Sequence, residues 1–184
     1  MRGLRPLMIA FAVLSGTAFA DSVSLSFSPF SQNVTAGQTI SVQVQISGLG
    51  NFAVPSVGSF DLFVSFDPTL LSPTTVTFGS LLGDPNIPQA ITASQFSATE
   101  LEFAEVSLLT PGELAALQPG TFVLSTLSFT ALTSGTATFK FSAGVVDDPF
   151  GQKLVVVPEP GTLFLVASGF LGLPWFRRGS RFCR

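Results

Sequence analysis

The chain has 184 residues and a formal net charge of −3, with no histidine, no tyrosine and one cysteine. Six of its eight basic residues lie near the two ends, so residues 21–157 hold two lysines and ten acidic residues, a net charge of −8. A segment this acidic repels phosphate backbones, which excludes nucleic acid as a partner. Without histidine, the usual general base, zinc ligand and Ser–His triad are missing, and we expect no enzyme.

Residues 1–20 have the pattern of a removable export leader. Arg2 and Arg5 precede an apolar run over residues 7–14, and Ala18 and Ala20 form a small-residue cleavage site. The run is too short to span a bilayer, since a spanning helix needs about 20 apolar residues. We therefore expect a signal peptide at 1–20; an uncleaved anchor or a buried helix is the alternative.

Residues 21–156 alternate between apolar and polar side chains, which is typical of half-buried β-strands. The clearest case is segment 39–47, and similar alternation occurs in 24–28, 60–66, 101–108, 122–132, 136–142 and 154–157. Turn signals such as Ser134-Gly135 separate these runs. Fourteen of the twenty phenylalanines lie between 21 and 157 and supply core material. The pattern predicts one all-β domain, an antiparallel sandwich or jelly roll.

One short segment, 111–117, predicts a helix instead of a strand. Thr110 is suited to the N-cap, Pro111 to the first helical position and Glu113 to the reciprocal capping-box position. Two turns gain little stability alone, so we expect this helix to pack against the sandwich.

Two groups of acidic residues are candidate sites. Glu100, Glu102 and Glu105 can be imagined as an acid/base pair for glycoside hydrolysis, but Glu100 and Glu102 at positions i and i+2 more simply form a solvated strand edge. Asp84 with Asn86, and Asp147 with Asp148, offer oxygen ligands for calcium, although the same residues are common turn formers. We expect no cofactor; bound calcium is the alternative.

Four stretches of this domain resemble the cohesin family: "VSLSFSP", "NVTAGQTISVQVQISGL", "GSFDLFVSFDPTLLSPTTVTFGSLL" and "LSTLSFTALTSGTATFKF". The resemblance covers most of 22–157 and implies a jelly roll of about nine strands without a catalytic site. It also implies protein–protein attachment, in cohesins by receiving a calcium-loaded dockerin module. Independently, Asp67 and Pro68 predict a turn that returns Leu70 and Leu71 to the core.

Residues 157–184 form a separate C-terminal segment. Pro158, Glu159 and Pro160 precede an apolar run, 161–176, of about 24 Å as a helix, which is short for a hydrocarbon core of about 30 Å. The basic residues that follow suit the cytoplasmic side of a membrane; they are Arg177, Arg178, Arg181 and Arg184.

This order is similar to the PEP-CTERM sorting signal of Gram-negative bacteria. The resemblance implies processing by exosortase at Pro158, Glu159 and Pro160, a transmembrane helix over 161–176, and a link to exopolysaccharide and biofilm. A plain membrane anchor or a core strand is the alternative. Cys183, the one cysteine, is interpreted as incidental.

Together these features predict an exported, non-catalytic protein of the cell surface or extracellular matrix, with a membrane-anchored intermediate at the inner membrane. Its partners would be exosortase, the membrane, and an unknown surface protein or exopolysaccharide. The alternative is a carbohydrate-binding module. Sugar binding usually uses exposed aromatic faces, and residues 21–157 have neither tyrosine nor tryptophan, so we favour protein attachment.

Overall fold

The computed structural model describes residues 23–154 and 156–158, which form eleven strands and one short helix. In chain order the elements are β1 (Val23–Ser28), β2 (Ser31–Val34), β3 (Thr39–Ser47), β4 (Ser59–Ser65), β5 (Leu71–Phe78), β6 (Ala90–Phe96), β7 (Glu100–Ser107), α1 (Pro111–Leu117), β8 (Thr121–Ala131), β9 (Gly135–Thr138), β10 (Lys140–Asp147) and β11 (Val156–Pro158).

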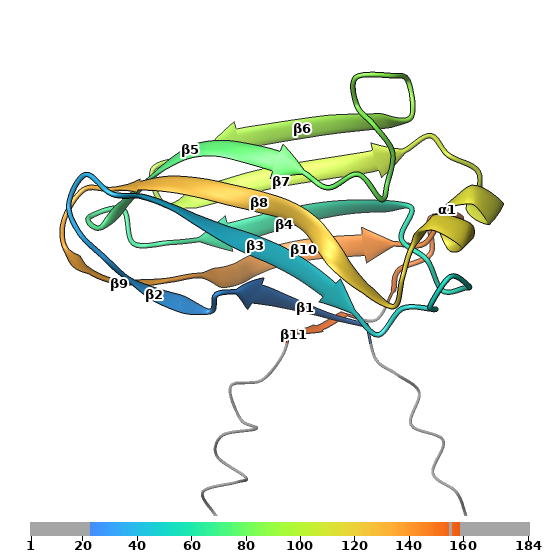
Figure 1. The fold of residues 1–184 in the computed structure, drawn as a ribbon, viewed down its shortest axis with the longest axis horizontal. Coiled ribbons are helices and arrows are strands. Elements are labelled where there is room, and N and C mark those ends of the chain that lie inside the picture. Colours follow the sequence, from blue (N-terminus) through green and yellow to red (C-terminus); the bar gives the residue numbers. More distant parts are fainter. Residues whose placement is uncertain (1–22, 155, 159–184) are drawn as a thin grey trace, which may run out of the picture.

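Two sheets lie face to face in a sandwich (Figure 1). The five-stranded sheet has the order β11-β1-β3-β8-β5, and the four-stranded sheet has the order β10-β4-β7-β6. Strands β2 and β9 form a small third sheet. Neighbouring strands are antiparallel except β1 and β11, which run parallel with Leu25 opposite Pro158. The first and last described strands therefore lie side by side.

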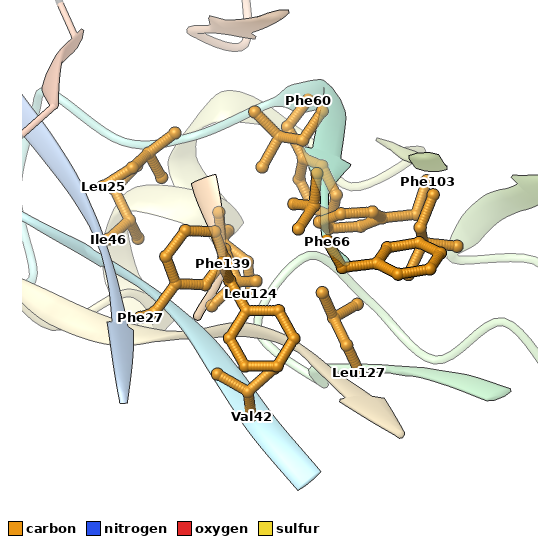
Figure 2. Packing of buried hydrophobic residues seen from close by; sticks show 14 of the residues in the cluster. Leu25, Phe27, Val42, Ile46, Phe60, Phe66, Phe103, Leu124, Leu127 and Phe139 are labelled. Carbon is orange, nitrogen blue, oxygen red and sulfur yellow. The ribbon is translucent and has the colours of Figure 1, made fainter. Parts of the chain in front are cut away.

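The core forms because each sheet turns its apolar positions inward. In β3 the expected alternation is confirmed: Ile40, Val42, Val44 and Ile46 are buried. Side chains from both sheets meet between them (Figure 2). Phenylalanine pairs connect distant segments, because Phe27 stacks on Phe141 with centroids 4.2 Å apart and Phe66 meets Phe129 edge-on at 5.3 Å.

The predicted helix is confirmed at 111–117, including its cap. The backbone N–H of Glu113 donates to the Thr110 hydroxyl at 3.4 Å, and the Thr110 N–H donates to the Glu113 carboxylate at 2.8 Å. Leu114 is the buried residue that docks the helix. Just after it, buried Gln118 accepts from the Val57 N–H at 2.7 Å and donates to the carbonyls of Val57 and Leu81.

The all-β jelly-roll prediction is correct, and the strand number is eleven instead of about nine. Strands β2, β5 and β6 were not predicted. The expected strand 136–142 divides at buried Phe139, where the chain passes from the small third sheet to the four-stranded sheet. No helix in the described part of the chain is long and apolar enough to cross a membrane; segments 1–20 and 161–176 lie outside that part.

Candidate interaction surfaces

The outer face of the four-stranded sheet combines apolar and acidic side chains. Register places exposed Ile91 of β6 opposite exposed Val106 of β7, and Ala93 opposite Ala104 one row further along. Asp61 of β4 extends the second row, because it pairs with Ala104. These five residues and Glu102 define what we call the mixed face. The same outer face also carries Phe63 of β4, which is half-buried and pairs with Glu102. Exposed apolar side chains on such a face are what a protein partner can cover.

The glutamates of β7 do not form a solvated edge as expected, because β7 lies between β4 and β6 in the sheet. Glu100 and Glu102 are half-buried on the outer face. The Glu100 carboxylate accepts a hydrogen bond from the Ser142 hydroxyl. Period two turns Glu105 to the opposite face, so the three carboxylates are not brought together as an acid/base pair.

Glu105 lies in the interior of the sandwich and is completely buried. Among the described residues neither of its carboxylate oxygens has a hydrogen-bond partner, and its cross-strand neighbours are Phe60 and Thr92. Burial raises the pKa of Glu105 to about 7, because an apolar environment disfavours the charged form. The inward orientation of Glu105 could be predicted from the sequence, since Glu105 lies an even number of residues from Leu101 and Phe103 and therefore on the same face of the strand.

The outer face of the five-stranded sheet has a different character. Strands β1, β3, β5 and β8 contain no charged residue. Their outward positions hold serine, threonine and glutamine, with Val123 as the apolar exception. Some of these side chains form hydrogen bonds with each other across neighbouring strands, as the Ser24 and Ser47 hydroxyls do at 2.7 Å. We call this surface the uncharged face.

Two of the three aspartates predicted as possible calcium ligands, Asp84 and Asp148, act as turn acceptors, whereas Oδ1 of Asp147 is buried without a hydrogen-bond partner among the described residues. The Asp84 carboxylate accepts the Asn86 N–H at 2.8 Å, which lowers the pKa of Asp84. Asp148 accepts N–H groups from Phe150 and Gln152 at 2.8 and 2.9 Å. Within residues 23–154 and 156–158, no group of three or more His, Cys, Asp or Glu is arranged to hold a metal.

The predicted Asp67 turn is present. The Asp67 carboxylate accepts the Thr69 N–H at 2.8 Å and its hydroxyl at 2.7 Å, which lowers the pKa of Asp67. Leu70 and Leu71 then return to the core and are buried. A cavity of about 210 Å³ lies between β1 and β10, lined by Leu25 and Phe141 among others, and no lining side chain is titratable.

The sorting and export residues lie mostly outside the described part of the chain. Pro158 is the exception: it ends β11, next to Leu25 of β1. The residues that cannot be placed are Ala18, Ala20, Glu159, Pro160, Arg177, Arg178, Arg181 and Arg184.

Two packed, mainly antiparallel sheets with one short docked helix define the described part of the chain as an all-β sandwich domain. The chain belongs to the cohesin-domain family, whose model matches residues 26–155. Cohesin domains are non-catalytic protein–protein interaction modules. A second model, the PEP-CTERM protein-sorting motif, matches residues 156–181 and supports export and membrane-anchored processing.

Solved structures agree on the fold. The sixth cohesin of scaffoldin B from Acetivibrio cellulolyticus, in complex with the Cel5 dockerin, is 19% identical and has a TM-score of 0.57, with 74% of this chain and 94% of that chain covered. The Clostridium thermocellum cohesin of a Coh-OlpA-Doc918 complex is 14% identical, with a TM-score of 0.57 and the same coverage.

A non-cellulosomal cohesin from the archaeon Archaeoglobus fulgidus is 15% identical, has a TM-score of 0.53 and covers 74% of this chain and 86% of its own. No curated protein sequence matches the chain. At these identities the structural comparisons establish the fold alone.

Proposed function

We propose that this protein is displayed outside the cell and attaches a protein partner through the mixed face of its cohesin domain. The observation that carries the proposal is the row of Ile91 and Val106, which are 61% and 48% exposed and pair across adjacent strands of the four-stranded sheet. Exposed apolar side chains that touch one another mark interaction sites more often than scattered ones do.

The chemistry of the mixed face also describes the partner. Asp61 and Glu102 lie beside the apolar row, so the surface favours a partner with apolar anchors and basic side chains around them. Solved cohesins similar in fold are in complex with dockerins. A dockerin-like module is therefore the class of partner that we propose.

The test is capture of partners from the producing cell's envelope by the immobilised protein. Val106→Asp should abolish capture, because it places a third carboxylate within the apolar row. Val123→Asp is the matched control, since Val123 also faces outward from an inner strand, but on the uncharged face. Equal capture by both variants, or loss with Val123→Asp alone, would contradict the assignment of the mixed face.

A second candidate function, binding of a neutral polysaccharide, is favoured by one specific observation. The uncharged face offers hydroxyl and amide groups such as Ser41, Gln43 and Thr126, which donate and accept hydrogen bonds as sugar hydroxyls do. It has no aromatic side chain on which a sugar ring can stack, so we rank it second. A glycan array beside the capture experiment separates the two. Glycan binding that Val123→Asp abolishes, without a protein partner, would reverse the ranking.

The two terminal segments of the chain are the basis for a proposal about where the protein is located. We propose that the leader 1–20 is removed, that the run 161–176 anchors an intermediate in the inner membrane, and that exosortase acts at Pro158, Glu159 and Pro160. The match of the sorting-motif model to 156–181 supports this proposal. We place the final product at the surface or in the extracellular matrix of a Gram-negative bacterium, in an exopolysaccharide or biofilm setting.

A further inference from the structure

We propose that two copies of this chain pair through strand β6, edge to edge and antiparallel, with the symmetry axis at Ala93. The four-stranded sheets of the two molecules then become one continuous sheet. This inference goes beyond the proposed attachment of a partner and does not depend on it. The pairing brings the two mixed faces side by side on one surface.

Strand β6 is an outer strand of the four-stranded sheet, and β7 is its neighbour on one side. Figure 1 shows β6 at the top of the sandwich, with the β5–β6 loop at its start. Two backbone hydrogen bonds bracket the β6–β7 ladder. The Leu108 N–H donates to the Gln89 carbonyl at 2.7 Å, and the Ser97 N–H donates to the Glu100 carbonyl at 2.9 Å. Both pairs continue the register of the ladder, so they fix which residues of β6 bond to β7.

The backbone groups on the free edge of β6 follow from that alternation. In an antiparallel pair, every second residue exchanges hydrogen bonds with the facing strand, and the residues between them point the other way. The bracketing bonds use odd-numbered residues of this segment. The even-numbered residues therefore direct their N–H and C=O groups outward; they are Ala90, Thr92, Ser94 and Phe96. In the described part of the chain, no hydrogen bond reaches these outward groups.

The other edges of the two sheets each have a feature that limits pairing with another chain. Strand β5 contains Pro73, where its register with β8 also shifts, and β11 is short and ends at Pro158. In β10, the Val146 carbonyl already accepts the Leu154 N–H at 2.9 Å. Strand β6 has no proline, no charged residue and no register shift against β7. An edge without such features is a template for a further strand.

The charge of β6 favours a second copy as the occupant of this edge. Residues 21–157 have a net charge of −8, so two copies repel each other wherever carboxylates meet. Strand β6 is uncharged, and a symmetric pair therefore brings no like charges directly opposite one another. The same strand offers no charge to attract a basic or acidic peptide. Its backbone and small side chains are what it presents, and a second β6 matches them.

Pairing about Ala93 matches the whole strand with itself. Ala93 then faces its own copy in a non-hydrogen-bonded pair, where the Cα atoms are about 4.5 Å apart and small side chains fit. Thr92 faces Ser94 of the copy, in a hydrogen-bonded pair.

Phe96 also gains from this register. It lies on the inward face of β6, opposite buried Leu101, yet it is 44% exposed because β6 is at the edge. The register places Phe96 opposite Ala90 of the copy, whose small side chain leaves room for the ring. Since the copy's β6 ends at Phe96, its chain turns toward β7 where the β5–β6 loop of the first molecule meets Ala90.

The test is disulfide cross-linking of the full chain in detergent micelles, with Cys183→Ser removing the one native cysteine. Ala93→Cys places two thiols opposite one another at the axis, at a Cα separation that a disulfide can bridge. Thr77→Cys is the matched control, because Thr77 is exposed on β5, an edge strand of the other sheet. With a mild oxidant, we expect at least about fivefold more linked dimer from position 93 than from position 77.

Ser94→Pro in the Ala93→Cys chain tests the backbone pairing itself. Proline removes an outward N–H and leaves the hydrogen bonds to β7 in place, so the melting temperature should stay unchanged. By symmetry each dimer loses this bond on both strands, and linking should slow at least about fivefold. Equal linking at positions 93 and 77, or unchanged linking in the folded Ser94→Pro chain, would overturn the proposal.

Sedimentation velocity gives the oligomeric state without a cross-link. We expect the wild-type chain in micelles to be a dimer and Ala93→Lys, which sets two lysines face to face at the axis, to be a monomer. This variant decides the question if Ser94→Pro does not fold. A monomeric wild type, or a dimer that Ala93→Lys leaves intact, would overturn the pairing through β6.

Discussion

Glu105 provides the sharpest prediction about stability, because its carboxylate is buried and has no hydrogen-bond partner in the described part of the chain. Its pKa is raised from 4.5 to about 7 in the folded domain. The folded state therefore holds this proton more tightly than the unfolded state does. The stability linked to Glu105 is fully present below pH 4.5, falls as the pH rises toward 7, and stays lost above it.

The magnitude follows from the shift. Raising the pKa from 4.5 to about 7 corresponds to a change of about 3 kcal/mol in the free energy of unfolding. This is an upper value, because the loss of stability is smaller if the ionised carboxylate moves or becomes hydrated. Urea unfolding of residues 21–158 between pH 4.5 and 8.5 measures this loss. Glu105→Gln keeps the shape without the titration, so the difference between the two proteins isolates Glu105 from the general repulsion of an acidic domain.

We expect the wild type to lose about 2–3 kcal/mol more than Glu105→Gln over this range. Glu105→Leu should be more stable than the wild type at pH 8, because it replaces a buried charge by an apolar group of similar size. Parallel pH profiles for the wild type and Glu105→Gln would refute the reasoning.

Three further substitutions test the packing by urea unfolding at pH 6. Gln118→Leu should cost about 2–4 kcal/mol, because the Val57 N–H and carbonyl lose their buried partner; a loss below 1 kcal/mol would contradict this role. Thr110→Ala should cost about 1 kcal/mol through loss of the helix cap, and an unchanged midpoint would count against it. Gly58→Ala should lower the free energy of unfolding by at least about 2 kcal/mol, since its Cβ would meet the Pro149 backbone at 2.5 Å. Wild-type stability of this variant would show that the chain segments at Gly58 and Pro149 can move apart.

The sequence predicted the elements that have strong local signals. Strand 39–47 alternates without a break, and the helix at 111–117 is marked by Thr110, Pro111 and Glu113. Strands β5 and β6 were missed for a physical reason. Both lie at an edge of their sheets, so their side chains are partly exposed on both faces and the period-two contrast is weak. Pro73 within β5 weakened its signal further.

The surfaces could not be predicted because they depend on register. Ile91 and Val106 are fifteen residues apart in the chain, and only the pairing of β6 with β7 places them together. The burial of Glu105 was missed for a different reason. Its charge suggested exposure to solvent, although its alternation with Leu101 and Phe103 placed it on the core face of the strand. The period-two pattern of the strand predicted the burial of this residue better than its charge did.

The central claim is that a binding domain is exported and processed at both ends. The intact mass of the protein recovered from the outside of the producing cells tests it most directly. We predict a product that begins at Asp21 and lacks residues 164–184. A surface protein whose mass includes either the leader or the C-terminal arginines would contradict the account.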